Sequence, residues 1–275
     1  MFFPHPGMQG IDPRMFHQQQ TKQEESDEKE QDFVVIIMAG GEGKRMNSSL
    51  PKVLHPFLGE PMLVRIIKMA ENLSPRKILV VTGKHHDLIK RVVEQKVTSH
   101  LIDYVQQKEP LGTGDAIKSC LPYLDSSSSV LILNGDMPAV QEELIAEFVN
   151  GCDEAGIMTM ELENPTGYGR IVKDKKKNFR GIIEEKDCTE EEKMIREVNT
   201  GVYYFSAMIL KCYIPKITNQ NRQNEYYLTD IVKVILEHED LDIHLFKVSK
   251  KNQYQLMGVN TPEELKNVES IVRRL

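Results

Sequence analysis

The sequence lacks tryptophan altogether and has only four cysteines among 275 residues. These cysteines are widely separated and include no CxxC pair, so they predict neither a zinc site nor a disulfide framework; they are Cys120, Cys152, Cys188 and Cys212. Reduced thiols in a cytoplasm are the simplest interpretation, and we expect a cytoplasmic protein.

Long apolar runs and a basic excess are also missing. No run approaches the ~20 apolar residues that a membrane-spanning helix requires, and residues 1–16 lack the basic start and apolar core of a secretory signal. We therefore expect no membrane partner. The 35 Lys and Arg against 41 Asp and Glu give a net charge of −6, which argues against a nucleic-acid partner. The basic run at 173–177 is interpreted as a solvated hairpin turn.

Apolar residues make up 40% of the chain, which is enough to bury a full α/β core. They are not spread evenly. Residues 1–31 are rich in Gln, Glu, Lys and Pro and have almost no periodic apolar pattern, so we expect a disordered tail there. Residues 32–275 are then the folded domain. Nothing in the sequence indicates the oligomeric state.

Strand and helix patterns alternate from Phe33 onward. The patterns predict strands at 33–38, 77–82, 101–105, 129–133 and 156–161, and helices at 62–73, 86–94, 114–121 and 141–150. This rhythm is typical of an α/β fold with a doubly wound, mostly parallel sheet, whose ligands bind at the carboxyl ends of the strands. A small mixed-sheet lobe is expected next, with strands at 169–172, 179–184 and 198–205 and a short helix near 189–195. The chain then returns through a helix at 227–238, a strand at 243–248 and a helix at 262–273.

The segment after the first strand has the composition of a phosphate-binding loop. Val34–Met38 is a continuous apolar run that is typical of a buried central strand. Gly40, Gly41 and Gly43 follow, and glycines let main-chain N–H groups approach a ligand closely. Glycines alone are equally compatible with an ordinary strand-to-loop turn.

Two cations extend this loop. Arg45 supplies a forked donor that matches phosphate oxygens, and Lys52 supplies a compact positive charge after Pro51. The spacing fits neither a Walker loop, because Met38 and Arg45 hold two of its required positions, nor a dinucleotide fingerprint, because Met46 stands where a small residue is needed.

Further short motifs follow the glycine loop, and together with it they span about residues 33 to 265. They are Gln107 with Leu111–Gly114, Asn134–Asp136, Gly167–Arg170, Glu184 with Lys186, Asn199–Gly201, Glu225–Tyr227 and Gly258–Asn260. With the glycine loop, this series resembles the sugar-nucleotide pyrophosphorylases. The most similar branch is the uridylyltransferase domain of the bacterial bifunctional UDP-N-acetylglucosamine pyrophosphorylase.

The resemblance implies a Rossmann-like nucleotidyltransferase domain over residues 32–275. It implies a Mg²⁺-dependent enzyme that converts UTP and N-acetylglucosamine 1-phosphate, its small-molecule partners, into UDP-N-acetylglucosamine and pyrophosphate. Two alternatives stay open: a glucose-1-phosphate nucleotidyltransferase, and a non-catalytic sugar-nucleotide sensor on the same fold. No hexapeptide repeat is present, so we expect no acetyltransferase activity from this chain.

The resemblance also assigns roles to individual residues. The catalytic candidates are Arg45 and Lys52. The nucleotide-binding candidates are Ala39, Gly40, Gly41, Gly43, Gln107, Gly112 and Thr113. The sugar-binding candidates are Gly169, Glu184, Asn199 and Thr200. The metal candidates are Asp136 and Asn260, whose oxygen atoms are ligands that suit Mg²⁺.

Some of these residues have simpler interpretations, and two positions depart from the family pattern. Asp136 alone could be a turn or capping aspartate, and Asn260 and Thr113 could each cap the helix that follows. Pro110 occupies a position that is often Gln in the family, so one contact to the base is in doubt. Lys44 replaces the usual Thr, and the sequence assigns it no role.

Overall fold

The computed structural model describes residues 33–238 and 241–275, and the expected disordered tail at 1–31 lies outside this part. Within the described residues, nine strands form one sheet: β1 (Phe33–Met38), β4 (Lys77–Thr82), β5 (Ile102–Gln106), β6 (Ser129–Asn134), β7 (Ala155–Glu161), β8 (Arg170–Lys173), β9 (Phe179–Ile183), β10 (Glu197–Ser206) and β11 (His244–Lys247). A separate two-stranded hairpin consists of β2 (Pro56–Phe57) and β3 (Glu60–Pro61).

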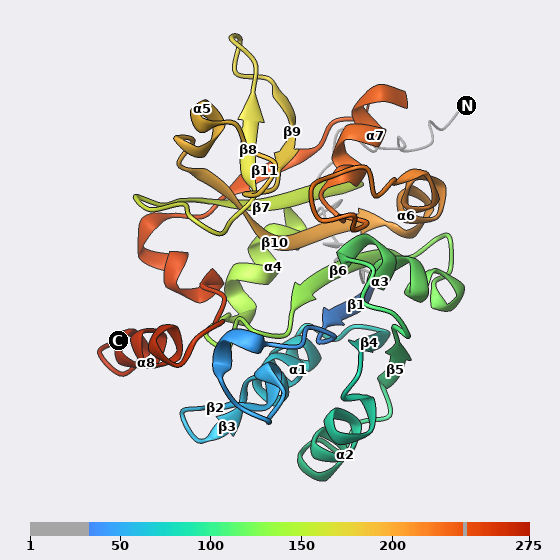
Figure 1. Cartoon of the computed structure of the whole chain (residues 1–275). Coiled ribbons are helices and arrows are strands. Elements are labelled where there is room, and N and C mark those ends of the chain that lie inside the picture. Colours follow the sequence, from blue (N-terminus) through green and yellow to red (C-terminus); the bar gives the residue numbers. More distant parts are fainter. Residues whose placement is uncertain (1–32, 239–240) are drawn as a thin grey trace, which may run out of the picture. The chain divides into compact units, whose positions relative to one another are not determined.

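The main path of the sheet runs β11-β7-β10-β6-β1-β4-β5 (Figure 1). All neighbouring pairs on this path are parallel except those of β10, which is antiparallel to both β6 and β7. The predicted mostly parallel α/β sheet is therefore confirmed. The β8–β9 hairpin, which was expected to form part of a small mixed-sheet lobe, is continuous with the main sheet because β8 pairs with β10.

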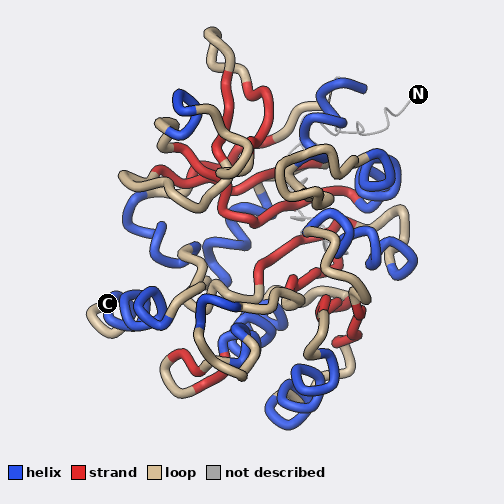
Figure 2. The backbone as a smooth tube through the Cα atoms, viewed as in Figure 1, coloured by secondary structure: helices blue, strands red, loops and turns tan. Residues whose placement is uncertain are grey.

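Helices cover both faces of the sheet, as the red strands and blue helices of Figure 2 show. The bounds are α1 (Met62–Asn72), α2 (His86–Lys96), α3 (Thr113–Cys120), α4 (Glu142–Asn150), α5 (Glu190–Lys193), α6 (Ala207–Tyr213), α7 (Asp230–His238) and α8 (Pro262–Val272). Helix α6 was not predicted, and α7 begins three residues later than the expected residue 227. No helix among the described residues is long and apolar enough to cross a membrane.

The central strand β1 explains the two-faced core. Successive side chains of a strand point to opposite faces, so Val35 and Ile37 pack with α1, α2 and α4, whereas Val34 and Ile36 pack with α3, α6 and α7. Because both faces are covered, the strand must be apolar at every position, which is why it appears in the sequence as one continuous hydrophobic run.

The pairing of β1 with β6 brings their two following loops together. The backbone N–H of Gly135 donates to the carbonyl of Met38 at 2.9 Å, which joins the loop after β6 to the end of β1. Strand β10 lies on the other side of β6 and has a bulge between Asn199 and Tyr203. At this bulge Gly201 has φ +79°, and an added Cβ would overlap the Asn134 side chain. Three distant segments therefore meet at one edge of the sheet.

Candidate active site

Two adjoining cavities open at this edge of the sheet. The first cavity has a volume of about 320 Å³ and is lined by the glycine loop, α3 and neighbouring segments, including Gly40, Gly41, Glu42, Lys52, Gln107, Gly112, Thr113 and Glu225. The second cavity, of about 260 Å³, is lined by residues including Arg45, Tyr168, Gly169, Glu184, Asn199, Thr200, Thr229 and Asn260. Four residues line both: Met38, Thr113, Asn134 and Asp136. The two cavities therefore form one continuous candidate site.

The glycine loop packs closely against the segment around Lys52. Gly43 has φ +63°, and an added Cβ would overlap the Cβ of Lys52, so a side chain is excluded on both grounds. Gly40 and Gly41 line the first cavity. The N–H of Ala39 donates to the carbonyl of Val81 at 2.8 Å and is thus engaged within the sheet. Neither Ala39 nor Gly43 lines either cavity. These two residues support the conformation of the loop through their contacts with Val81 and Lys52.

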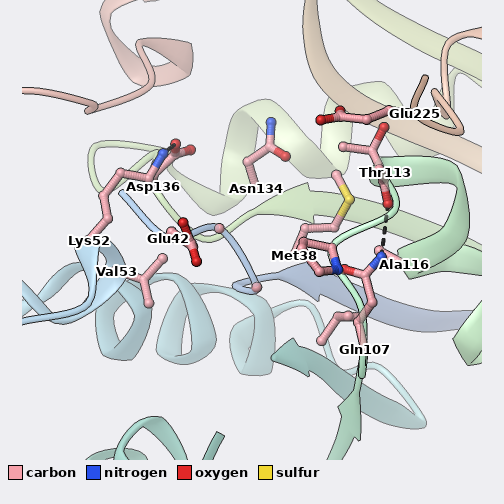
Figure 3. Close-up of a pocket in the computed structure, with 15 residues that line it drawn as sticks. Met38, Glu42, Lys52, Val53, Gln107, Thr113, Ala116, Asn134, Asp136 and Glu225 are labelled. Atoms are coloured by element: carbon pink, nitrogen blue, oxygen red, sulfur yellow. Dashed lines mark hydrogen bonds and ion pairs between the residues drawn. The ribbon is translucent and has the colours of Figure 1, made fainter. Parts of the chain in front are cut away.

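Lys52 joins the two candidate metal ligands. Its Nζ donates to Oδ2 of Asp136 in an ion pair and to Oδ1 of Asn260 at 2.9 Å. Figure 3 shows the ends of Lys52 and Asp136 pointing toward each other at the edge of the first cavity. The Lys52 and Asp136 side chains are only 14% and 16% exposed, so this pair is largely shielded from water.

The oxygen atoms of Asp136 and Asn260 therefore already converge on one cation, the ammonium of Lys52. This arrangement fits the expected metal site, since a hard divalent cation prefers carboxylate and amide oxygens. No group of three or more His, Cys, Asp or Glu among the described residues could hold a metal. A metal held by Asp136 and Asn260 would have to complete its coordination with phosphate and water oxygens.

The sequence left open that Asn260 and Thr113 only cap the helices that follow them. The structure excludes both of these interpretations. Helix α8 is capped by Thr261, whose Oγ1 accepts from the N–H of Glu264 at 3.2 Å, so Asn260 is not its cap. Helix α3 begins at Thr113 itself, with Gly112 at the capping position and no side-chain cap. The hydroxyl of Thr113 instead accepts from the N–H of Leu228 at 2.9 Å.

Arg45 and Lys44 lie on the short helix Lys44–Met46 that follows the glycines. Arg45 lines the second cavity rather than the first, so the two candidate catalytic cations reach the site from different sides. Lys44 is 86% exposed and its Nζ pairs with Oε2 of Glu42 at 2.9 Å. This hydrogen bond lowers the pKa of Glu42 and raises the pKa of Lys44.

The far end of the first cavity is arranged around Gln107. The Nε2 of Gln107 donates to the carbonyl of Gly112 at 3.0 Å and to Oδ2 of Asp115 at 2.8 Å. Both partners are acceptors, so they fix the orientation of the amide, and its Oε1 remains an acceptor for a ligand. Gly112 has φ +116° and lies so close to Tyr226 that a Cβ would be 2.5 Å from that residue's carbonyl oxygen. Pro110, which departs from the family pattern, also lines this cavity.

Glu184 is one of three residues with a carboxyl group that line the second cavity, the others being Asp136 and Glu264. The Oε1 of Glu184 accepts from the hydroxyl of Thr229 at 2.9 Å. Burial raises the pKa of the Glu184 carboxyl above its ordinary value, with nearby acidic residues adding to the effect of burial. Gly169 lies beside Glu184, and an added Cβ there would approach Ile182 Cγ2 to 2.9 Å and Glu184 Oε1 to 3.6 Å. A side chain at this position would crowd the cavity wall.

The polar groups of Asn199 and Thr200 are largely engaged within the protein. The Nδ2 of Asn199 donates to the Tyr203 hydroxyl at 2.6 Å, and its Oδ1 accepts from the N–H of Gly201 at 3.1 Å. The hydroxyl of Thr200 donates to the carbonyl of Met158 at 2.9 Å. These bonds hold the bulge of β10 in place and leave one N–H of the Asn199 amide for a ligand.

Several cavity residues were not among the predicted site residues. Glu42, Glu225 and Thr229 contribute polar side chains to the cavity walls. Asn134 lines both cavities, and its side-chain amide makes no hydrogen bond to any other residue in the described part of the chain. Its position at the end of β6, two residues before Asp136, is the signal that could have identified it.

The chain is similar to known proteins along most of its length. A family model described as nucleotidyl transferase matches residues 34–251. The protein of Acanthamoeba polyphaga mimivirus named "Probable UDP-N-acetylglucosamine pyrophosphorylase" is 45% identical over 242 residues, which cover 86% of this chain and 95% of the viral protein. The "Bifunctional protein GlmU" of Paraburkholderia phymatum is 36% identical over 242 residues, covering 87% of this chain. Those residues are 52% of the bacterial protein, so the chain spans about half its length.

The fold is also found among solved structures. A UDP-glucose pyrophosphorylase complexed with UDP-glucose superposes with a TM-score of 0.68 at 15% sequence identity. The match covers 88% of this chain and 99% of the solved chain. At this low identity the likeness establishes the shared fold alone.

Proposed function

Because this chain belongs to the nucleotidyl transferase family, we propose that it is a uridylyltransferase that makes UDP-N-acetylglucosamine and pyrophosphate from UTP and N-acetylglucosamine 1-phosphate. The observation that carries this proposal is the pair of adjoining cavities that share Asp136. One cavity is lined by the glycine loop and the other by sugar-binding candidates. The 45% identity to the viral protein supports the choice of substrates.

The chemistry requires the two substrates to be held in line. A sugar 1-phosphate is already largely dianionic near neutral pH, since its second pKa is about 6. Its oxygen can attack the α-phosphorus of the triphosphate without a protein base, and pyrophosphate leaves on the opposite side. The protein therefore has to position the reactants and neutralise the negative charge that meets at one centre.

Lys52 and Arg45 are the proposed catalytic residues. Lys52 lines the first cavity and Arg45 the second, while Asp136 lies at the border that both share. Phosphate groups at this border would thus be approached by one cation from each side. Lys52 supplies a compact charge, and Arg45 supplies a planar fork that suits two oxygen atoms of one phosphate.

Asp136 and Asn260 are the proposed ligands of Mg²⁺, because their oxygen atoms already converge on the Lys52 ammonium. When bound there, the metal would neutralise phosphate charge and orient the phosphate oxygens. Lys52 would then leave these oxygens and become free to contact phosphate.

The base is proposed to bind beside Gln107. With its Nε2 engaged by Gly112 and Asp115, Gln107 presents an acceptor. An acceptor matches the imide N–H of uracil and opposes the bare ring nitrogen that cytosine has at the same position. The free thiols of the chain agree with the cytoplasmic location that we include in this proposal.

The sugar is proposed to bind in the second cavity, which is lined by Gly169, Glu184, Asn199 and Thr200. The Glu184 carboxylate can accept from sugar hydroxyls, and the remaining N–H of Asn199 can donate to an acetamido oxygen. Thr200 contributes through its backbone, since its hydroxyl is engaged by Met158.

Pyrophosphate release tests the proposal directly. The purified chain would be incubated with Mg²⁺, with each of UTP, dTTP, CTP, ATP and GTP, and with N-acetylglucosamine 1-phosphate or glucose 1-phosphate. We expect UTP with N-acetylglucosamine 1-phosphate to give the highest kcat/KM, and EDTA to stop turnover. Asp136→Ala prepared in parallel controls for contaminating enzymes. A wild-type protein that binds UDP-N-acetylglucosamine and releases no pyrophosphate from any pair would instead be a sensor.

A further inference from the structure

A buried arginine lies directly behind the wall of the second cavity. The side chain of Arg170 is 1% exposed and is one of the largest fully buried side chains in the described residues. A buried charge is costly unless it is paired and hydrogen-bonded. Arg170 is the first residue of β8 and does not itself line either cavity.

The guanidinium of Arg170 connects two walls of that cavity. One of its nitrogens, Nη1, donates to the backbone carbonyl of Tyr168, which lines the cavity. The other, Nη2, pairs with Oε2 of Glu185 at 2.6 Å, and Glu185 adjoins the cavity residue Glu184. Nη2 also lies 3.5 Å from the carbonyl of Lys193 in α5. One rigid group thus holds a turn, a strand end and a helix in a fixed arrangement.

Other contacts also hold this turn, because the Tyr168 side chain packs against the core and hydrogen-bonds to the backbone of Gly258, and β8 pairs with β9 from Arg170 onward. The N–H of Tyr168 donates to Pro165 within the same turn at 3.2 Å, and the carbonyl of Gly169 accepts from the N–H of Asn199 at 2.9 Å. The first of these bonds is internal to the turn, and the second anchors only its last residue. The Arg170 fork adds a side-chain link to these contacts, because it joins the Tyr168 carbonyl directly to the Glu185 carboxylate beside Glu184.

We propose that Arg170 is a positioning residue for the sugar, and that its bonds to Tyr168 and Glu185 set the width of the second cavity. This inference rests on the proposed function, in which that cavity receives the sugar. The fork geometry is required, because a lysine could keep the charge but could not bond the Tyr168 carbonyl and the Glu185 carboxylate from one planar group.

The same hairpin provides a matched control. Arg180 of β9 pairs with Oδ2 of Asp174 at 2.6 Å, but its side chain is 60% exposed and lines neither cavity. Arg170→Lys therefore removes a guanidinium fork at a buried position of this hairpin, and Arg180→Lys removes the same group at an exposed position. Glu185→Gln is the second test variant, because it keeps the volume and an acceptor oxygen while removing the charge.

Binding and kinetics would be measured for these three variants and the wild type. Calorimetry with UDP-N-acetylglucosamine and with UMP separates sugar contacts from nucleotide contacts and does not need turnover. We expect Arg170→Lys and Glu185→Gln to weaken binding of the sugar nucleotide about tenfold, which is on the order of one lost hydrogen bond to the sugar. UMP binding should stay within about twofold. KM for the sugar 1-phosphate should rise by the same factor, while KM for UTP and all values of Arg180→Lys should be unchanged.

Other outcomes would overturn the inference. If Arg170→Lys and Glu185→Gln lower Tm but leave the affinity ratio of the two ligands unchanged, the ion pair only stabilises the fold. If the variants bind UMP and the sugar nucleotide more weakly by the same factor, the effect is not specific to the second cavity. If the wild type binds the two ligands equally, the second cavity does not hold the sugar. Absence of turnover in a wild type that prefers the sugar nucleotide would contradict the proposed reaction and leave the positioning role standing.

Discussion

Replacing Lys52 by methionine should strengthen the binding of a divalent cation to the nucleotide-free protein, even though it should impair catalysis. The ammonium of Lys52 now donates to the oxygen atoms of Asp136 and Asn260 that are proposed to bind the metal. A metal that enters without nucleotide must therefore displace the lysine first. Methionine has a similar length but no charge, so it removes this competition.

The magnitude follows from the bonds that the lysine has to give up. Hydrogen bonds to charged groups contribute about 1.5–3 kcal/mol net, and the two side chains of this ion pair are only 14% and 16% exposed. The Asn260 bond adds less, because the displaced ammonium regains water. Since about 1.4 kcal/mol corresponds to a factor of ten, Lys52→Met should tighten metal binding by about 10- to 100-fold.

Titration with Mn²⁺, followed by the loss of the free-ion electron paramagnetic resonance signal, measures this affinity without turnover. Lys44→Met is the matched control, because it removes one exposed positive charge from the same loop and leaves the Lys52 bonds intact. Asp136→Asn should abolish the tight site in the Lys52→Met background. Equal or weaker Mn²⁺ binding by Lys52→Met than by Lys44→Met would refute the competition.

Four further outcomes are expected. Asp136→Ala should lower kcat by at least about 100-fold with near-UV circular dichroism unchanged, and Asn260→Ala should be milder because water can replace a neutral ligand. The wild type should prefer N-acetylglucosamine 1-phosphate over glucose 1-phosphate in kcat/KM, and Asn199→Ala should narrow that gap. Burial raises the pKa of Glu184, so the folded protein retains a proton that the unfolded chain has lost, and stability falls as pH rises through the raised value. Glu184→Gln should therefore raise Tm near pH 8 while harming use of both sugars, and the gain in Tm should disappear as pH falls toward about 4. Deletion of residues 1–30 should leave activity and Tm nearly unchanged; a large fall in either would contradict the composition argument.

The fold was predictable because its buried strands are continuous apolar runs and its helices have periodic apolar faces. Strands β1 and β4 have the predicted bounds for this reason. Helix α6 was missed because Ala207 follows β10 without a loop, and the change of structure depends on a single cap in which Ser206 Oγ accepts from Ile209 N–H. One hydroxyl in an apolar stretch is too weak a signal to be recognised without the tertiary contacts.

The convergence of the glycine loop and Asp136 was also predictable, since the carboxyl ends of adjacent parallel strands meet at one edge. The hydrogen bonds of Lys52 could not be predicted from the sequence. Its partners Asp136 and Asn260 lie 84 and 208 residues away along the chain. The loop before α8 reaches the site because the N–H of Val259 donates to the Asp136 carbonyl at 2.9 Å, a contact that no local pattern encodes.

The second cavity shows that a motif can lie at a cavity wall while most of its polar atoms are engaged within the protein. The Asn199–Thr200 pair lies at the cavity, but its hydrogen bonds to Tyr203 and Met158 mainly hold the bulge of β10. Glu184 is different, because its carboxyl group is buried and, within the described part of the chain, accepts one hydrogen bond, from the Thr229 hydroxyl at 2.9 Å. An acceptor that is desolvated and only partly satisfied has most to gain from the hydroxyls of a ligand. Discrimination between sugars should therefore depend more on the Glu184 wall, and on its distance from Tyr168, than on the number of polar residues in the motif.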